Sequence, residues 1–151
     1  MELNDDFFEY IKTVLIKLRE VIGEDFVVFG SAPLYLLGVV DFNGEINDLD
    51  ISIKNENSIP KNAKRVTFHK NQKKYFYKIE IEGFQIDLAP AWEGQEDQFN
   101  KIFQNPIVVN DFKFANLDVV EGWKKEMVKK FNRQKDIAYL KKIEEYRNRI
   151  N

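Results

Sequence analysis

The chain has 151 residues, the size of one domain, and its 44% hydrophobic and 14% aromatic content is enough for a core. It has no cysteine, which excludes a disulfide framework and a thiolate metal site. The net charge is only −2, yet residues 124–149 carry ten basic and four acidic side chains. Such a basic segment either suits a polyanionic substrate or forms solvated helix faces.

The start of the chain is acidic and lacks the features of a signal peptide, and no apolar run is as long as a membrane span. We therefore expect a cytoplasmic protein with no membrane contact. Apolar residues at helical spacing predict a helix over 7–22. A short strand over 26–29 follows, and Ser31 is placed to cap a helix that reaches about Gly38.

The rest of the pattern alternates short strands with turns before ending in helices. Strands are expected at 48–53, 65–69, 74–82 and 84–89, a short helix at 93–103, and a hairpin over 107–114. Two helices close the chain. This order predicts one α+β domain over 1–151, with a sheet core over about 24–115 and C-terminal helices over about 116–150.

Two aspartates one residue apart are the most informative feature of the sequence. Alternate side chains of a strand share a face, so Asp48 and Asp50 point to one side while Leu49 and Ile51 point to the core. Two carboxylates on one face repel each other unless a cation lies between them, and hard divalent cations prefer oxygen ligands. The alternative is a solvated acidic strand edge.

A third acid, Asp87, lies between Ile86 and Leu88 on a later predicted strand and should face away from the core that they enter. Such an acid costs stability unless it is paired with Lys or Arg or bound to a metal. His69 is the only histidine, so a histidine-based metal site is excluded, and we expect it on a strand surface.

Three motifs in order carry a family resemblance: Gly30-Ser31 after an apolar strand, Asp48-Leu49-Asp50-Ile51, and Ile86-Asp87-Leu88. They resemble the polymerase-beta-like nucleotidyltransferase superfamily. Residues 117–124 and 133–140 look like the lysine-bearing helix and the Arg-x-Lys-Asp-x-x-x-Leu segment of its minimal, abortive-infection toxin branch. The resemblance runs from about Phe26 to Leu140 and implies a mixed sheet packed by helices, with a C-terminal helical pair.

The resemblance implies a metal-dependent enzyme that moves an NMP from an NTP, such as ATP, to an acceptor hydroxyl and releases pyrophosphate. The implied catalytic residues and ligands of Mg²⁺ or Mn²⁺ are Asp48, Asp50 and Asp87. Asp87 would also act as general base. The implied nucleotide-binding residues are Gly30, Ser31, Lys124 and Arg133, the last two as alternatives for neutralising the triphosphate.

The toxin-like branch implies an RNA such as tRNA, or a protein, as acceptor, and a cognate antitoxin as partner. Two alternatives stay open, a small-molecule (antibiotic-type) nucleotidyltransferase and a non-catalytic nucleotide- or partner-binding module of the same fold. The chain departs from the family pattern in the sixteen residues between Ser31 and Asp48, a longer loop that would reshape the nucleotide pocket. Trp92, Phe99 and Phe103 either stack on a base or pack the core.

Overall fold

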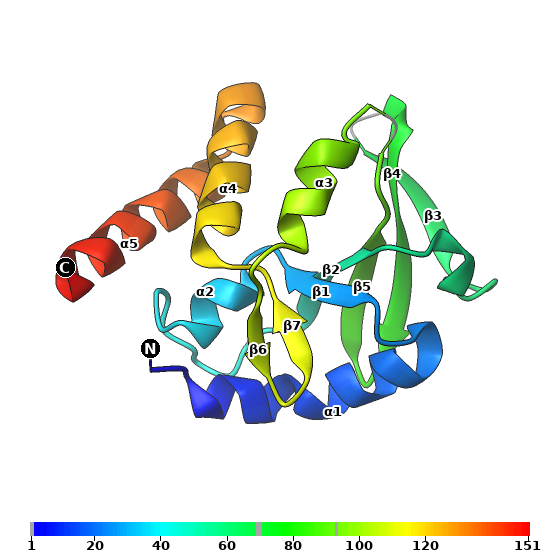
Figure 1. Cartoon of the computed structure of the whole chain (residues 1–151), viewed down its shortest axis with the longest axis horizontal. Coiled ribbons are helices and arrows are strands. Elements are labelled where there is room, and N and C mark those ends of the chain that lie inside the picture. The colour runs from blue at the N-terminus through cyan, green and yellow to red at the C-terminus, as the bar shows by residue number, and fades with distance from the viewer. Residues whose placement is uncertain (1, 69–70, 93) are drawn as a thin grey trace.

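A seven-stranded mixed sheet in the order β3-β4-β5-β2-β1-β7-β6 forms the centre of the computed structural model, which describes residues 2–68, 71–92 and 94–151 (Figure 1). The strands are β1 (Phe26–Phe29), β2 (Asp48–Ile53), β3 (Lys64–Phe68), β4 (Asn71–Ile81), β5 (Phe84–Ala89), β6 (Ile107–Val109) and β7 (Phe112–Phe114). β2 runs parallel to β5, and β1 runs parallel to β7 and antiparallel to β2.

Helices pack on the sheet and end the chain as a pair. They are α1 (Asp5–Ile22), α2 (Ala32–Leu36), α3 (Glu96–Ile102), α4 (Leu117–Phe131) and α5 (Gln134–Ile150), with a 3-10 turn η1 (Glu56–Ser58). The predicted α+β architecture, with a mixed sheet and a C-terminal helical pair, is confirmed. Among the described residues, no helix combines the length and apolar character needed to cross a bilayer.

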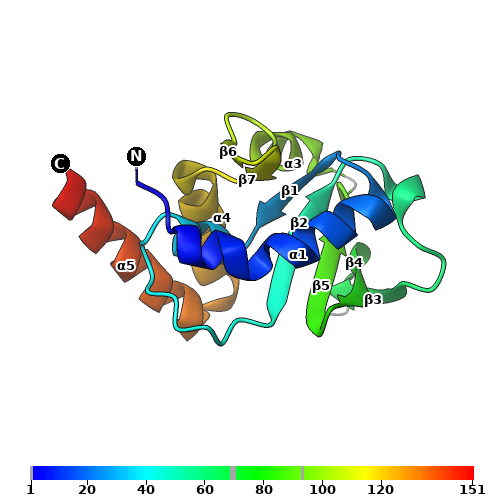
Figure 2. The ribbon, with the colours of Figure 1, turned by 90° about the horizontal axis from the view of Figure 1, so that it is seen from below.

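α1 covers one face of the sheet, as Figure 2 shows from below. Its buried stripe, which includes Phe7, Ile11 and Leu15, packs against strand residues such as Ile51 and Ile86. The helix forms because apolar residues recur at helical spacing and because Asn4 caps it, accepting a hydrogen bond from a first-turn backbone N–H. This core holds the strands in place for the opposite face.

A second core lies on the opposite side of the sheet, between the strands and α2, α3, α4 and α5. Val27 and Phe29 of β1 enter it, together with Val120 of α4 and Ile143 of α5. The two cores divide β1 by alternation, because Val28 points instead toward α1. The helices on this second side leave part of the sheet uncovered, and that part carries the predicted acids.

Three sequence-based expectations need correction or fall outside the described residues. Ser31 makes no side-chain capping hydrogen bond, and α2 is one short turn that ends at Leu36 rather than near Gly38. α3 begins at Glu96 instead of residue 93. Glu93 and His69 lie outside the described residues, so the expected surface position of His69 stays a prediction.

Candidate functional site

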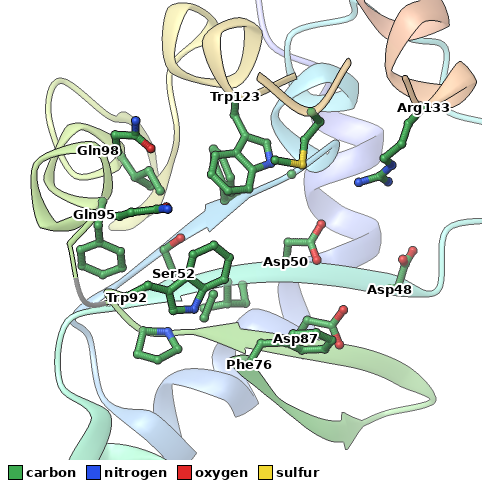
Figure 3. Close-up of a pocket in the computed structure, with 18 of the residues that line it drawn as sticks. Asp48, Asp50, Ser52, Phe76, Asp87, Trp92, Gln95, Gln98, Trp123 and Arg133 are labelled. Carbon is green, nitrogen blue, oxygen red and sulfur yellow. The ribbon is translucent and has the colours of Figure 1, made fainter. Parts of the chain in front are cut away.

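The three predicted acids lie on neighbouring parallel strands and share one face of the sheet. Asp48 and Asp50 alternate with the buried Leu49 and Ile51 on β2. Asp87 lies on β5 directly opposite Asp50 in the strand register. Because directly opposite residues project to the same side, the three carboxylates point into the same open space, as Figure 3 shows. The predicted shared face is therefore present.

The carboxyl group of Asp50 is electrostatically the most perturbed of the three acids. The Asp50 side chain is exposed toward the open pocket, although many protein atoms, including those of Gly30, surround its carboxyl group. This burial, together with the charges of Asp87 and Asp48, raises the pKa of Asp50 to about 6, against the opposing effect of Lys124 and Lys135. At neutral pH the group is therefore mostly ionised, but it takes up a proton more readily than an ordinary aspartate.

Asp87 is half-buried and held in place by its neighbours. Burial raises its pKa, while a hydrogen bond donated by Gln85 Nε2 to Asp87 Oδ1 at 3.2 Å and the charge of Lys78 lower it. Asp48 acts in the opposite direction and favours the protonated form. Gln85 thus orients one oxygen of Asp87 and leaves the carboxylate next to the other acids.

Gly30 lies against the side chain of Asp50, at the turn between β1 and α2. A Cβ atom placed on Gly30 would lie 2.2 Å from Asp50 Oδ2, and the backbone there has φ of +66°. Only glycine combines that left-handed conformation with so close an approach. The glycine predicted to admit a phosphate therefore makes room for the Asp50 carboxylate.

A pocket of about 350 Å³ extends from the acids to an apolar end. Gly30, Arg133 and Lys135 line it with the acids. The rest of the pocket is lined by aromatic rings and two primary amides, in the side chains of Phe29, Trp92, Phe99, Trp123, Gln95 and Gln98, while Phe76 lies beside Asp87 (Figure 3). Figure 3 shows the amides of Gln95 and Gln98 on the side away from the carboxylates. The pocket thus has one end lined by charged side chains and another lined mainly by aromatic rings.

A buried ion pair ties the C-terminal helices to the turn after β1. Lys124 of α4 donates hydrogen bonds to Ser31 Oγ at 3.2 Å and to Asp136 Oδ1 of α5 at 3.3 Å. Its ammonium group lies 4.2 Å from the ring centre of Tyr139. Burial lowers the pKa of Lys124, and the charge of Asp136 opposes that shift. Lys124 is thus saturated by protein groups.

Asp136 is shared between two cations. Arg133 Nε lies 3.3 Å from its second oxygen, Oδ2, which accepts no hydrogen bond from the described residues. Asp136 is 3% exposed, so the pair it forms with Lys124 lies in the interior. Arg133 is exposed and also lines the pocket. Asp136 therefore positions both Lys124 and Arg133.

The acids offer the donor chemistry of a divalent-metal site but not a preformed one. Within the described part of the chain, no three His, Cys, Asp or Glu side chains are arranged to hold a metal ion. Three carboxylates on one face, whose mutual repulsion contributes to the raised pKa of Asp50, nevertheless fit a hard cation.

The predicted site residues fall into two groups. Asp48, Asp50, Asp87, Gly30 and Arg133 line the pocket. Ser31 and Lys124 are not among its lining residues, and their side chains bond to each other.

Sequence reasoning missed three kinds of residue near the site. Asp136 appeared only as the Asp of the Arg-x-Lys-Asp segment, and no role was assigned to it, because its partner Lys124 lies on another helix. Gln95 and Gln98 were not singled out either. Lys78 had a usable signal, because the hairpin turn at Glu82-Gly83 sets the register that brings it beside Asp87.

No family model matches this sequence, and no curated protein matches it. Among solved structures, the chain is similar to the crystal structure of JHP933 from Helicobacter pylori, at 15% sequence identity and a TM-score of 0.38. The alignment covers 82% of this chain and 57% of that protein, so the chain spans less than two thirds of its length.

Proposed function

We propose that this protein is a metal-dependent nucleotidyltransferase that transfers an NMP from an NTP to an acceptor hydroxyl. The observation that carries the proposal is the common face of Asp48, Asp50 and Asp87, with Asp50 and Asp87 directly opposite each other on parallel strands. The sequence resemblance to the polymerase-beta-like superfamily supports the same reaction. An RNA or a protein is the proposed acceptor, as in the toxin-like branch.

The pocket suits the two halves of a nucleotide. Its volume of about 350 Å³ lies within the range of small-molecule sites, roughly 300–1,000 Å³. The triphosphate belongs at the end lined by charged side chains, where Arg133 and Lys135 supply positive charge. The nucleobase belongs at the aromatic end, where Trp92 and Trp123 offer flat surfaces and Gln95 and Gln98 offer hydrogen-bonding groups.

In the proposed reaction the acceptor oxygen forms a bond to the α-phosphorus, and the bond from that phosphorus to the bridging oxygen breaks. Pyrophosphate leaves, and the proton of the acceptor hydroxyl passes to a carboxylate oxygen of Asp87. Its raised pKa makes Asp87 a better base than an ordinary aspartate. Mg²⁺ or Mn²⁺ bound by the three acids would supply charge neutralisation for the attacking and leaving oxygens.

Label transfer is the direct test. The protein would be incubated with Mg²⁺, each ribonucleoside triphosphate labelled on its α-phosphate, and total RNA, bulk protein or aminoglycosides as acceptors. We expect label on RNA or protein and release of pyrophosphate. Label on the aminoglycoside would instead support the small-molecule alternative.

Matched aspartate variants control for the site. Asp50→Asn and Asp87→Asn should abolish transfer, whereas Asp111→Asn should not. Asp111 lies in the β6–β7 turn with φ of +68°, a conformation that asparagine adopts readily. Equal transfer by all three variants would reject the acids as the catalytic centre.

A non-catalytic nucleotide-binding module is the second candidate. It is favoured by the absence, among the described residues, of three acids already arranged as metal ligands. A module of this kind would bind the NTP without metal and release no pyrophosphate. Melting curves with NTP alone, Mg²⁺ alone and both together separate the two candidates, because only ligands of the folded state raise the melting temperature.

A further inference from the structure

The sheet face that carries the acids continues onto β4 and β3, where it becomes basic. Lys78 of β4 lies directly opposite Asp87 of β5, and Lys64 of β3 lies directly opposite Lys78. All three therefore project to the same side. Neighbouring strands are about 4.8 Å apart, so the backbone of Lys64 lies only about 10 Å from that of Asp87.

This extension alternates lysines with an aromatic ring along β4. Lys74, Phe76 and Lys78 share the site face by strand alternation. The ammonium of Lys74 lies 5.8 Å from the Trp92 ring centre, and that of Lys78 lies 5.7 Å from the Phe76 ring centre. We call the four residues Lys64, Lys74, Phe76 and Lys78 the lysine face. It borders the pocket, which Phe76 and Trp92 also line.

Among the described residues, no carboxylate oxygen lies within 4.0 Å of the ammonium of Lys64, Lys74 or Lys78, although the charge of Lys78 acts on Asp87 of the neighbouring strand. Residues 60–78 contain seven Lys or Arg and no Asp or Glu, and the next acid on this face of β4 is Glu80, two residues after Lys78. Like charges directly opposite each other on a sheet, such as Lys64 and Lys78, destabilise it. An anionic ligand would relieve that repulsion.

The basic C-terminal helices differ, because acids accompany most of their cations. Arg147 pairs with Asp118 at 2.7 Å and with Glu121 at 3.3 Å, and Lys142 lies 3.9 Å from Glu145. Lys130 lies 3.8 Å from Glu126. Residues 117–150 still carry ten basic and six acidic side chains, but most of the cations lie beside an acid, which makes the helix pair a weaker candidate for a polyanion.

From these observations we infer that the lysine face binds a single-stranded polynucleotide acceptor and leads its terminal hydroxyl to Asp87. Lysines at alternate strand positions match phosphates, and the intervening ring of Phe76 matches an unstacked base. The bases of a duplex are stacked inside the helix and cannot stack on the Phe76 ring, and an acidic peptide has no base to stack on it. The inference rests on the proposed function, because it assigns the acceptor of that reaction.

Equilibrium binding tests the inference without catalysis. Fluorescence anisotropy would follow a labelled single-stranded RNA of about 12 nucleotides, a typical length for such sites, over a range of salt concentrations. The same DNA strand, the duplex and a polyglutamate competitor serve as comparisons. We expect a single strand to bind best and polyglutamate not to displace it.

Paired variants locate the surface. Each phosphate contact to a single strand contributes about 0.7 to the slope of log affinity against log salt, so Lys64→Gln/Lys78→Gln should lower the slope by about 1.4. Lys64→Gln alone, one strand further from Asp87, should lower it by about 0.7. Lys64→Arg/Lys78→Arg should retain the parent slope, and thermal melting confirms that each variant folds.

The matched control removes the same charge from the helix pair. Lys141→Gln/Lys142→Gln on α5 should leave the slope unchanged, because α5 and the β3–β4 hairpin lie at opposite ends of the molecule in both ribbon views (Figures 1 and 2). An equal loss in the control variant would overturn the inference. So would a parent protein that binds the duplex as well as the single strand, or one whose RNA is displaced by polyglutamate.

Thermal melting with Mg²⁺ and NTP tests the proposed function independently of RNA binding by the lysine face. RNA binding through the lysine face without any NTP-dependent rise in melting temperature would reject the nucleotidyltransferase and keep the surface. An NTP-dependent rise without RNA binding would keep the enzyme and reject the lysine face.

Discussion

The pocket and the junction of the C-terminal helices each contain an aspartate, but the charges around the two aspartates are opposite in sign. In the pocket, Asp50 faces two other carboxylates, and its pKa is raised to about 6. At the junction, Asp136 is more deeply buried, yet it has Lys124 and Arg133 within 3.3 Å. Among the described residues, no cation contacts Asp50, whereas two contact Asp136.

This difference separates a candidate ligand site from a structural contact. A buried charge with protein partners holds elements together, and removing one partner leaves the other uncompensated. A charge opposed by like charges costs stability in the ligand-free protein and gains from a bound cation. The comparison therefore predicts opposite effects of neutralising Asp50 and Asp136.

The largest expected effect is on nucleotidyl transfer by the pocket acids. Asp50→Asn and Asp87→Asn should each lower the transfer rate by roughly 10³-fold or more, about 4 kcal/mol of transition-state stabilisation. Their melting temperatures should not fall, because neither acid is needed to compensate a buried cation. Initial rates of labelled NMP transfer measure the effect. A fully active Asp87→Asn variant would show that Asp87 has no catalytic role.

Asp136→Ala should act on stability instead. Breaking a buried ion pair from one side costs about 3–5 kcal/mol, which for a domain of this size corresponds to a fall in melting temperature of roughly 10 °C. Lys124→Met/Asp136→Leu should recover most of that loss, because it leaves no buried charge unpaired. Thermal unfolding of the single and double variants is the measurement, and a neutral Asp136→Ala would contradict the structural role.

Gly30→Ala tests the contact between the β1–α2 turn and Asp50. Left-handed backbone costs a residue with a Cβ about 1–2 kcal/mol, and the new atom would also displace the Asp50 carboxylate. Gly44→Ala is the matched control, since Gly44 has φ of +83° but no atom within 4 Å of a built Cβ. Both should lose stability, and only Gly30→Ala should also lose the melting shift with Mg²⁺ and NTP.

The smallest expected effect is a pH-dependent gain in stability for Asp50→Asn. The folded-state pKa of about 6 exceeds the unfolded value of about 3.9, so the folded protein binds this proton more tightly. Asp50 therefore costs no stability below about pH 4, and that cost grows between about pH 4 and 6 and is complete at higher pH. Asp50→Asn should melt a few degrees higher than the parent at pH 8 and no higher at pH 4 without metal. The reverse order would show that the carboxylate is compensated.

The sequence by itself determined most of the secondary structure and the face of each acid. The strand Asp48–Ile53 has the predicted bounds, as has Phe84–Ala89, because alternation of apolar and polar residues is a local property of the chain. The same alternation places Asp48, Asp50 and Asp87 away from the core. It does not by itself say that β2 and β5 are neighbours.

Tertiary structure decided which charges meet. The parallel pairing of β2 and β5 sets Asp50 against Asp87, and helix packing brings Lys124 from position 124 to Ser31 and Asp136. The sequence offered Lys124 or Arg133 for the triphosphate, and only the structure shows that the Lys124 ammonium bonds to Ser31 and Asp136 while Arg133 lines the pocket. The net charge of a segment cannot tell a cation that is free to bind a ligand from one that is paired inside the protein. The energy of a charge depends on its solvation and on partners that are distant in sequence.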